Sequence, residues 1–331
     1  MKGSFYYVLG VIFGFWAVYM LNYDVLSKKP SVFRYFLGLE LHEFNALNSK
    51  IKERYAAYEQ KRLFRADRTR KVGAGHPFKL SQTDRLLMLL VYYHLYVSST
   101  LAAYLFDLSQ TNVLKNIRKL EPLVSEVLPL PKKQHKKARR LQTLDEVEAM
   151  FPGFKAFLDA TEQEIPRPKS KRKRKTHYSG KKKRHTVKTQ ITVNKDGLVV
   201  HKAGHARGSR HDYSLFKWRH PCLPDTVCLG LDRGYDGIQN DYPKLKCEVP
   251  FKRRSLGRGK RGVKTKELTS EQKSFNQRLS KERVVAEHTI SRLKKFRIWA
   301  EEFRNRLKHY DVMTCIVCGI INFRIAGTIA I

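Results

Sequence analysis

The chain has 331 residues, of which 66 are Lys or Arg and 30 are Asp or Glu, so its formal net charge is +36. An apolar content of 42% is ordinary and allows a packed core. A charge this far from zero repels itself unless a polyanion or counterions neutralise it. The composition therefore argues against a merely soluble basic protein and points to nucleic acid, with an anionic membrane surface as the competing partner.

The first 21 residues form an apolar extension. Residues 5–21 read FYYVLGVIFGFWAVYML, which is about the minimum length for a membrane span and also resembles a signal anchor. Met20 offers an alternative start just before the polar sequence that follows. We expect residues 1–19 to be translated upstream sequence, and we expect no membrane partner. A membrane-anchored basic protein is the alternative, and it rests on this segment alone.

Residues 22–75 are predicted to form an N-terminal helical region. Apolar side chains recur at helical spacing between residues 31 and 66, which predicts an amphipathic helical stretch. A basic, glycine-containing break follows it.

Residues 76–130 predict three helices with short joints, because Ser81 and Ser109 suit helix N-caps and Pro129 and Pro131 end the run. The last two helices have the proportions of a helix-turn-helix. The apolar residues that would join them are Leu101, Ala102, Leu105, Val113, Ile117 and Leu120. The polar face that could enter a DNA groove comprises Gln110, Asn112, Lys115, Asn116 and Arg118. A plain helical packing module shows similar spacing and is the alternative.

Residues 131–152 are predicted to be a basic linker followed by a short helix, which Thr143 and Glu146 would cap.

Strand character then marks five segments: KAFLDAT, HTVKTQITVN, LVVHKAGHA, TVCLGLD and KCEVPFK. Helices are predicted at 212–217 and, much longer, at 269–299. This order describes a mixed sheet flanked by helices, although the first strand could also be helical by its periodicity.

Two basic tracts interrupt the domain predicted for residues 153–331. They read RPKSKRKRKTHYSGKKKRH at 167–185 and KRRSLGRGKRGVKTK at 252–266. We expect both to be flexible and placed to hold phosphates, with the first supplying the candidate DNA contacts Lys181, Lys182, Lys183 and Arg184. The second has a GxGxxG spacing, but no strand leads directly into a helix there. We therefore expect a loop and reject a dinucleotide site.

Cysteine and histidine give no metal site. The five cysteines include one CxxC pair, Cys315 and Cys318, with no second pair at zinc spacing, so we expect them to pack in the core. His201, His205 and His211 fit no ligand spacing and are expected to be solvated or to contact phosphate. Among the acidic residues, Asp212 is expected to cap the helix that follows it.

Three other acidic residues occupy positions that suggest chemistry. Asp159 lies within an apolar strand, where an ionised carboxylate needs a partner or a metal. Asp232 ends the strand VCLGLD, at an edge where sheet-based sites tend to lie. Glu287 shares one face of the long helix with Arg283 and Lys294. Oxygen-only ligands suit Mg²⁺ or Mn²⁺, while an ordinary ion pair is the alternative for each carboxylate taken alone.

Several stretches resemble the insertion-sequence-five family of DDE transposases and their Harbinger-type relatives. These are FPGFKAFLDATEQEI, YSGKKKRHTVKTQ, GLDRGYDGIQ, VVAEHTISRLKKFRI and FRNRLKHYDVMTCIVCGIINFRI. The likeness extends from about Asn22 to the C-terminus. It implies an α+β multidomain protein in which an all-α helix-turn-helix region precedes an RNase H-like mixed β-sheet flanked by helices.

The resemblance also assigns the site. Asp159, Asp232 and Glu287 match the three family carboxylates, which implies two divalent metal ions and no small-molecule cofactor. The family pattern Tyr-x2-Arg-x3-Glu-x6-Lys is met at Arg283, Glu287 and Lys294, but Ser280 stands at its tyrosine position. That departure puts a tyrosine-dependent role in doubt and leaves the carboxylates untouched.

The implied function is DNA cleavage at the ends of a mobile element and strand transfer into target DNA. The implied partners are terminal-repeat DNA, target DNA and further copies of the chain assembled on DNA. The expected location is the cytoplasm and nucleoid, or the nucleus of a eukaryotic host. The alternative is a catalytically inactive or co-opted DNA-binding protein derived from a transposase.

Overall fold

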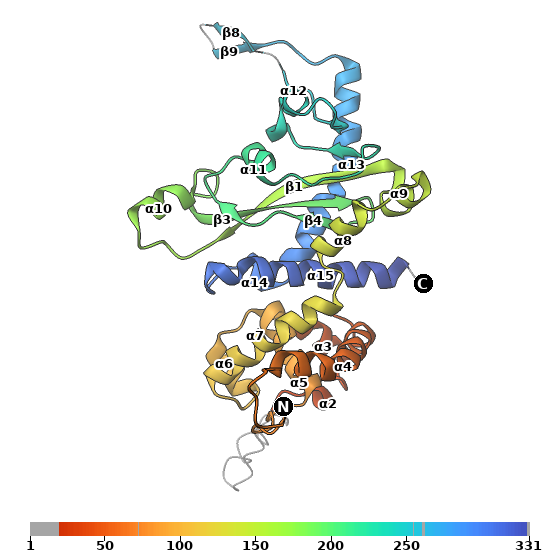
Figure 1. The fold of residues 1–331 in the computed structure, drawn as a ribbon. Coiled ribbons are helices and arrows are strands. Elements are labelled where there is room, and N and C mark those ends of the chain that lie inside the picture. The colour runs from red at the N-terminus through yellow and green to blue at the C-terminus, as the bar shows by residue number, and fades with distance from the viewer. Residues whose placement is uncertain (1–19, 72, 254, 260–261, 330–331) are drawn as a thin grey trace, which may run out of the picture.

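The computed structural model describes residues 20–71, 73–253, 255–259 and 262–329, so the predictions for residues 1–19 lie outside the described residues. A group of helices occupies one end of the molecule and a β-sheet the other, with helix α15 between them (Figure 1). This arrangement is the predicted α+β architecture, with the helical region first in the chain.

The predicted helical stretch between residues 31 and 66 is two helices, which follow the short α2. Their bounds are α2 (Tyr23–Leu26), α3 (Pro30–Leu37) and α4 (Leu41–Leu63). Gly38 ends α3 with a φ of 70°, the left-handed conformation that glycine adopts without a steric penalty. Glu40 and Glu43 then form a capping box that starts α4. The predicted helical character of this stretch is therefore confirmed, with a break between the two helices at Gly38.

The predicted three-helix unit is present as α5 (Gln82–Leu95), α6 (Ser99–Leu105) and α7 (Gln110–Val127). Both predicted caps are confirmed, since the Ser81 hydroxyl accepts from Asp84 N and the Ser109 hydroxyl accepts from Asn112 N. Leu101 was expected to pack between α6 and α7, but it is 46% exposed. The other five predicted joining residues are buried or packed against the core.

Residues 131–138 were predicted to be a linker and instead form α8 (Pro131–Ala138). Proline suits the first turn of a helix because its missing N–H would be unpaired there anyway, and α8 packs against strand β4 (Val199–Lys202). The next helix, α9 (Leu144–Met150), has the predicted capping box of Thr143 and Glu146.

The sheet is mixed and has the order β2-β3-β1-β6-β7, with β4 and β5 also paired to β3. Strand β1 is antiparallel to β3 and parallel to β6, so the first strand is confirmed as a strand. The remaining bounds are β1 (Lys155–Glu164), β2 (Tyr178–Ser179), β3 (Arg184–Asn194), β5 (Ala206–Arg207), β6 (Cys228–Gly230) and β7 (Cys247–Glu248).

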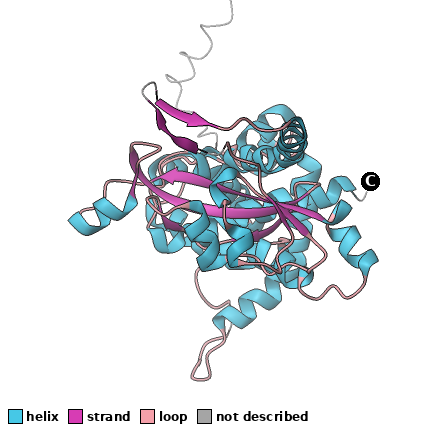
Figure 2. Cartoon of the chain, turned by 90° about the horizontal axis from the view of Figure 1, so that it is seen from above, coloured by secondary structure: helices cyan, strands magenta, loops and turns pink. Residues whose placement is uncertain are grey.

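Both basic tracts contain regular structure where flexible segments were expected. The first forms α10 (Lys171–His177) and β2. The second includes an antiparallel pair, β8 (Ser255–Gly259) and β9 (Gly262–Thr265), which lies apart from the main sheet (Figure 2). Two paired strands are not the strand-to-helix unit that a dinucleotide fold requires, so rejecting that site remains consistent with the structure.

Helices cover both faces of the sheet. Strand side chains alternate, so Phe157 joins the core with α13 and α15, while Ala156 and Leu158 join a second core with α9 and α11. The bounds are α11 (Asp212–Arg219), α12 (Ile238–Asp241), α13 (Ser270–Lys294), α14 (Arg297–Ala300) and α15 (Tyr310–Ile329). The long helix was predicted to reach Trp299, but it ends at Lys294, and the buried Phe296 packs against the ring of His94.

One helical segment in the described part of the chain, Leu307–Gly327, is long and apolar enough to cross a membrane by length and composition. More than half of its most apolar window, 56%, is buried inside the protein, as expected of a core helix. It carries Cys315 and the fully buried Cys318, both unpaired thiols, in agreement with the predicted packing role.

Candidate active site and DNA-binding surfaces

Strand β1 brings Asp159 to the α13 face of the sheet, because Asp159 has the same alternation as Phe157. Its Oδ1 accepts a hydrogen bond from the main-chain N–H of Ala160 at 2.8 Å. Burial raises the pKa of Asp159 above its ordinary value, and the negative charge of Asp232 raises it further, whereas Arg283 opposes both. The carboxylate is therefore held in a partly desolvated place where a cation would be stabilised.

Asp232 is close enough to Asp159 for their charges to interact, and the register of two parallel strands contributes to this. Phe157 pairs with Gly230, and each aspartate follows two residues later, Asp232 at the N-cap of the short 3-10 helix Arg233–Tyr235 that comes after β6. Asp232 Oδ1 accepts from Arg233 N at 2.7 Å, and the buried Arg283 guanidinium lies 3.7 Å from it. The side chain of Asp232 remains 55% exposed.

Helix α13 supplies the third carboxylate. Thr269 and Gln272 cap its start, and its apolar residues pack on β1 and β3. Glu287 and Lys294 are seven residues apart, so they lie on one stripe of the helix. Arg283 lies one turn before Glu287 and contacts Asp232 rather than the pocket described next.

A pocket of about 610 Å³ lies between β1, β3, α11 and α13. Five of the residues predicted from the sequence line this pocket: Asp159, Glu287, Lys181, Lys182 and Lys294. Asp232, Arg283, Lys183 and Arg184 are not among the lining residues, and Arg184 is instead paired with Glu164 at 2.7 Å. Among the residues that the structure describes, no three His, Cys, Asp or Glu side chains converge closely enough to hold a metal ion.

The charges in this pocket interact. Burial lowers the pKa of Lys294 and the neighbouring Lys182 lowers it further, whereas Asp159 and Glu162 raise it. Two of the predicted lysines therefore lie together in the pocket, and Lys294 is close enough to Asp159 for their charges to interact.

Sequence reasoning missed a second charge cluster in the same pocket. Lys188 on β3 is only 8% exposed, and its Nζ lies 2.7 Å from Asp212 and 3.5 Å from Glu162. Asp212 was expected to cap α11, but His211 holds the cap position and Asp212 is the first helical residue. The available signal was a lysine within the otherwise buried strand sequence TVKTQITV, since a buried cation requires carboxylate partners.

Two of the three histidines differ from their predicted role. His205 was expected to be solvated or to contact phosphate, but its Nδ1 lies 2.8 Å from Asp311 Oδ2. His201 packs its ring 4.7 Å from the ring of His135 and is largely buried, which lowers its pKa to about 3. His211 is exposed and lines the pocket.

The helix-turn-helix presents most of its predicted polar face to solvent. Gln110, Asn112, Lys115 and Arg118 are all accessible on α7. Asn116 is only 9% exposed, and its amide donates to the main-chain oxygen of Asn112 at 2.8 Å, so it does not belong to that face. Helix α7 lies in the helical group at one end of the molecule, and the elements that border the pocket, β1, β3, α11 and α13, lie above α15 (Figure 1).

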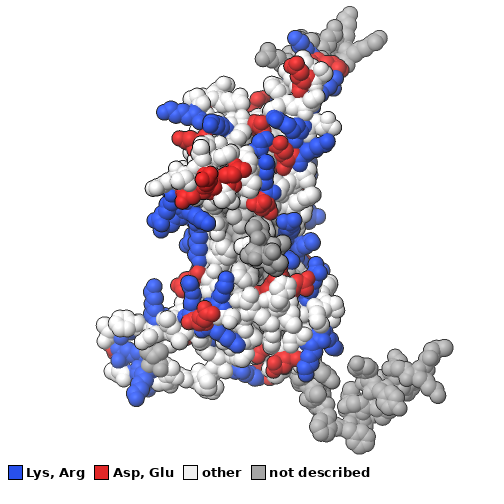
Figure 3. Space-filling view, turned by 90° about the vertical axis from the view of Figure 1, so that its right-hand side faces the viewer, with Lys and Arg blue, Asp and Glu red and all other residues white. Residues whose placement is uncertain are grey.

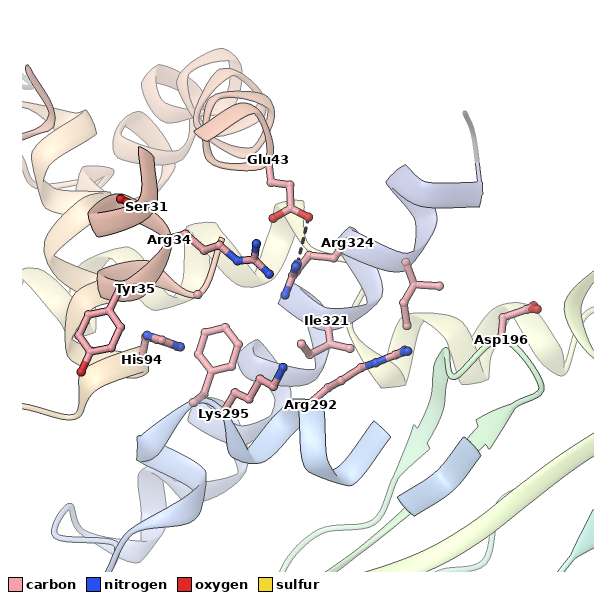
Figure 4. Close-up of a pocket in the computed structure, with 13 residues that line it drawn as sticks. Ser31, Arg34, Tyr35, Glu43, His94, Asp196, Arg292, Lys295, Ile321 and Arg324 are labelled. Atoms are coloured by element: carbon pink, nitrogen blue, oxygen red, sulfur yellow. Dashed lines mark hydrogen bonds and ion pairs between the residues drawn. The ribbon is translucent and has the colours of Figure 1, made fainter. Parts of the chain in front are cut away.

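A larger cavity, of about 810 Å³, lies between α3, α13 and α15 (Figure 4). Arg292 on α13 and Lys295 at the C-cap of α13 line it, and Glu287 is not among its lining residues. Arg34 pairs with Glu40 at 2.9 Å, and Arg324 contacts Glu43 at 3.0 Å. We interpret this cavity as part of the joint between the helical region and the sheet, because residues of both parts line it.

Comparison with known proteins identifies the families of two parts of the chain. Residues 158–322, which contain all three carboxylates, match the model of the DDE superfamily endonucleases, and residues 78–130 match the helix-turn-helix of DDE superfamily endonuclease. A probable transposase for insertion sequence element IS702 from Microchaete diplosiphon is 30% identical over 266 residues, covering 80% of this chain and 88% of that protein. No solved structure matches the chain significantly. The chain therefore belongs to the DDE transposases, with a DDE superfamily endonuclease domain that follows its helix-turn-helix domain.

Proposed function

We propose that this DDE transposase cuts DNA at the ends of its element with two Mg²⁺ or Mn²⁺ ions held by Asp159, Asp232 and Glu287. The proposal is supported best by two observations: Phe157 pairs with Gly230 and each aspartate follows two residues later, and the charge of Asp232 acts on Asp159. Carboxylate oxygens are the ligands that hard cations prefer. Each aspartate uses one oxygen for a main-chain N–H, which leaves the other for a cation. The ions would supply Lewis acidity at the phosphodiester.

The chain's own cations would bind the substrate. Lys182 and Lys294 line the pocket, and the charge of Lys294 interacts with that of Asp159, so the two lysines would stabilise the negative charge that develops on the attacked phosphate. In the first step, water attacks phosphorus and the bond to O3′ breaks, which leaves a 3′-hydroxyl and a 5′-phosphate. In the second, that 3′-hydroxyl attacks a target phosphodiester and displaces the 3′-oxygen of the target strand.

Recognition of the element ends would be the task of α7. Its accessible residues Gln110, Asn112, Lys115 and Arg118 have the hydrogen-bonding groups that read base edges and phosphates. The exposed residues Lys183 and Arg184, next to the pocket, would hold the backbone without sequence preference. Because two element ends must be processed together, we propose that the protein works as a homo-oligomer on DNA, in the nucleoid or the nucleus.

The test is cleavage of a duplex that carries the element's own end. Asp159→Asn, Asp232→Asn and Glu287→Gln should each lower the cleavage rate by at least about 100-fold in Mg²⁺, while DNA affinity stays near that of the wild type. Glu271→Gln, at the exposed start of the same helix, is the matched control and should cleave normally. Near-normal cleavage by any of the three site variants would remove that residue from the metal-binding set.

The same assay addresses the alternative of a co-opted DNA-binding protein. A wild-type protein that binds the element end with sequence preference but leaves it uncut in both Mg²⁺ and Mn²⁺ would support the alternative and contradict the nuclease proposal.

A further inference from the structure

The segment Phe64–Lys79 connects α4 to the helix-turn-helix, and both of its ends lie near α7. Close to its start, Tyr58 in the last part of α4 donates to the main-chain oxygen of Lys119 at 3.0 Å. At its end, Lys79 forms an ion pair with Asp107 in the turn before α7. Both ends of the segment are therefore anchored close to α7.

The described part of this segment has a defined conformation. The Arg68 guanidinium donates to three main-chain oxygens, those of Leu63 at 3.1 Å, Arg70 at 2.6 Å and Lys71 at 3.0 Å. These bonds use Arg68 internally and leave the side chains of Arg65, Arg70 and Lys71 exposed to solvent. The segment thus presents three exposed cations next to a set of internal hydrogen bonds, which reduce the entropy that the bonded residues lose on binding.

A groove of about 670 Å³ separates the end of the segment from α7. His76, Phe78 and Lys79 line one side of it, and the α7 residues that line the other side include Asn112, Lys115 and Lys119. Asp107 is its one acidic lining residue and is already paired with Lys79. The groove therefore has an excess of positive charge immediately beside the helix expected to read DNA.

A buried cation beneath the groove strengthens this field. Arg85 is 2% exposed, its Nη1 donates to the Tyr55 hydroxyl at 2.7 Å, and its guanidinium lies 3.8 Å from the ring centroid of Phe78. No carboxylate in the described part of the chain lies within ion-pair distance of it, and its Nε has no hydrogen-bond partner. A buried charge without a carboxylate attracts an anion to the nearest accessible surface.

We propose that the segment Phe64–Lys79 is a second DNA-contacting element, and that its groove with α7 holds the sugar-phosphate backbone of the strand flanking the site that α7 reads. This inference rests on the proposed role of α7 in DNA recognition. Arg65, Arg70 and Lys71 contact phosphates from the loop, and Lys119 contacts one from the groove wall. The element adds affinity and orientation without reading bases.

The test is the salt dependence of binding, measured by fluorescence anisotropy with the full chain and two duplexes, one with the element end and one unrelated. A plot of log K against log salt has a negative slope, and each phosphate contact adds about 0.9 to its magnitude. Arg65→Gln/Arg70→Gln/Lys71→Gln should therefore reduce the magnitude of the slope by about 2 to 3. The loss should be equal on both duplexes. Lys119→Gln should reduce the magnitude of the slope by about 1.

The matched control removes three exposed cations from another part of the helical region, as Lys28→Gln/Lys29→Gln/Lys52→Gln. Its slope should stay close to that of the wild type. A loop variant that behaves like this control overturns the proposal, and so does a loop variant that changes sequence preference at an unchanged slope.

A second variant separates this inference from the proposed function. Gln110→Ala/Asn112→Ala should remove the preference for the element end and leave the salt slope nearly unchanged. If the preference survives in that variant, α7 is not the reading helix and the proposed function of α7 fails, whereas an unchanged slope in the loop variant counts against the segment alone.

Discussion

Lys188 shows how a single residue organises the candidate active site. Its ammonium group lies between Glu162 of β1 and Asp212 of α11, and it also donates to the main-chain oxygen of Arg210 at 2.8 Å. It therefore ties two sides of the pocket together and neutralises carboxylates that would otherwise repel the negative charge of Asp159.

Removing this charge should be costly. Lys188→Met leaves Glu162 and Asp212 without their partner, and we expect the free energy of unfolding to fall by about 3 kcal/mol, the lower end of the range for a broken buried pair because Asp212 is partly exposed. Urea unfolding measures it. Adding Asp212→Asn to the variant should recover part of the loss, and equal stabilities of the wild type and Lys188→Met would contradict the ion-pair interpretation.

His201 predicts a pH dependence of stability. Burial lowers its pKa to about 3 in the folded protein, with His135 and Lys202 adding to the shift, whereas the pKa in the unfolded chain is about 6.5. Between these values the unfolded state binds more protons, so stability decreases as the pH falls from about 6.5 towards 3, by up to about 1.4 kcal/mol per pH unit. Unfolding at several pH values should show a shallower decrease for His201→Gln. The exposed His288→Gln should follow the wild type.

At the scale of the element, α7 depends on its N-cap. The Ser109 hydroxyl accepts from Asn112 N at 3.3 Å, at the end of the helix that carries Gln110 and Asn112. Loss of this bond frays the first turn, where the proposed reading residues lie.

We therefore expect Ser109→Ala to lower the free energy of unfolding by about 1 kcal/mol and to weaken binding to the element end more than binding to unrelated DNA. Ser109→Asp preserves a capping oxygen and should restore both properties. Thermal unfolding and anisotropy measure them, and Thr111→Ala, an exposed position inside the same turn, is the control. An Asp variant as weak as the Ala variant would argue against the cap.

Helix α13 borders two cavities. Glu287 and Lys294 line the candidate active-site pocket, while Arg292 and the C-cap residue Lys295 line the larger cavity (Figure 4). Because a helix turns by about 100° per residue, neighbouring residues can serve two surfaces. One element therefore connects the site to the joint with the helical region.

At the scale of the whole molecule, Asn322 on α15 links the two halves. Its side chain is fully buried, accepts from Val199 N at 2.8 Å, and donates to the main-chain oxygens of Val199 and Pro129 at 2.9 Å. Val199 belongs to the sheet, and Pro129 follows the helix-turn-helix. The Asn322 amide thus satisfies the main-chain N–H and C=O of Val199, as a neighbouring strand would, and also bonds to the segment that follows the helix-turn-helix.

Asn322→Leu should leave these buried groups unpaired and lower the free energy of unfolding by about 2 to 4 kcal/mol. Because the same side chain serves both halves, spectroscopic probes of helix and of sheet should shift together in denaturant. Val312→Ala, at a 44% exposed position on the same helix, should have little effect. Separate transitions for the two halves in the wild type would contradict a joined core.

Positive charge is a property of the whole molecule as well. Lys and Arg side chains occur along the length of the face in Figure 3, over both ends of the protein. Binding to unrelated DNA should accordingly weaken steeply with salt, as is general for surfaces that contact many phosphates.

Local signals in the sequence were sufficient for much of this protein. The caps at Ser81, Ser109 and Thr143 and the strand around Asp159 could be predicted because each depends on residues only a few positions apart. The three carboxylates, together with the resemblance of the stretches around them, likewise indicated the transposase family, because those stretches are short and continuous in the chain.

Tertiary structure decided what depends on distant partners. Which carboxylates pair with Lys188, and the burial of His201, were not predictable, because the residues that they contact lie far away in the sequence. The same holds for α8, whose basic sequence looks solvated until its apolar side packs on β4. Pairing between distant segments depends on the geometry of the whole fold, whereas a helix cap or a strand pattern is contained in a few consecutive residues.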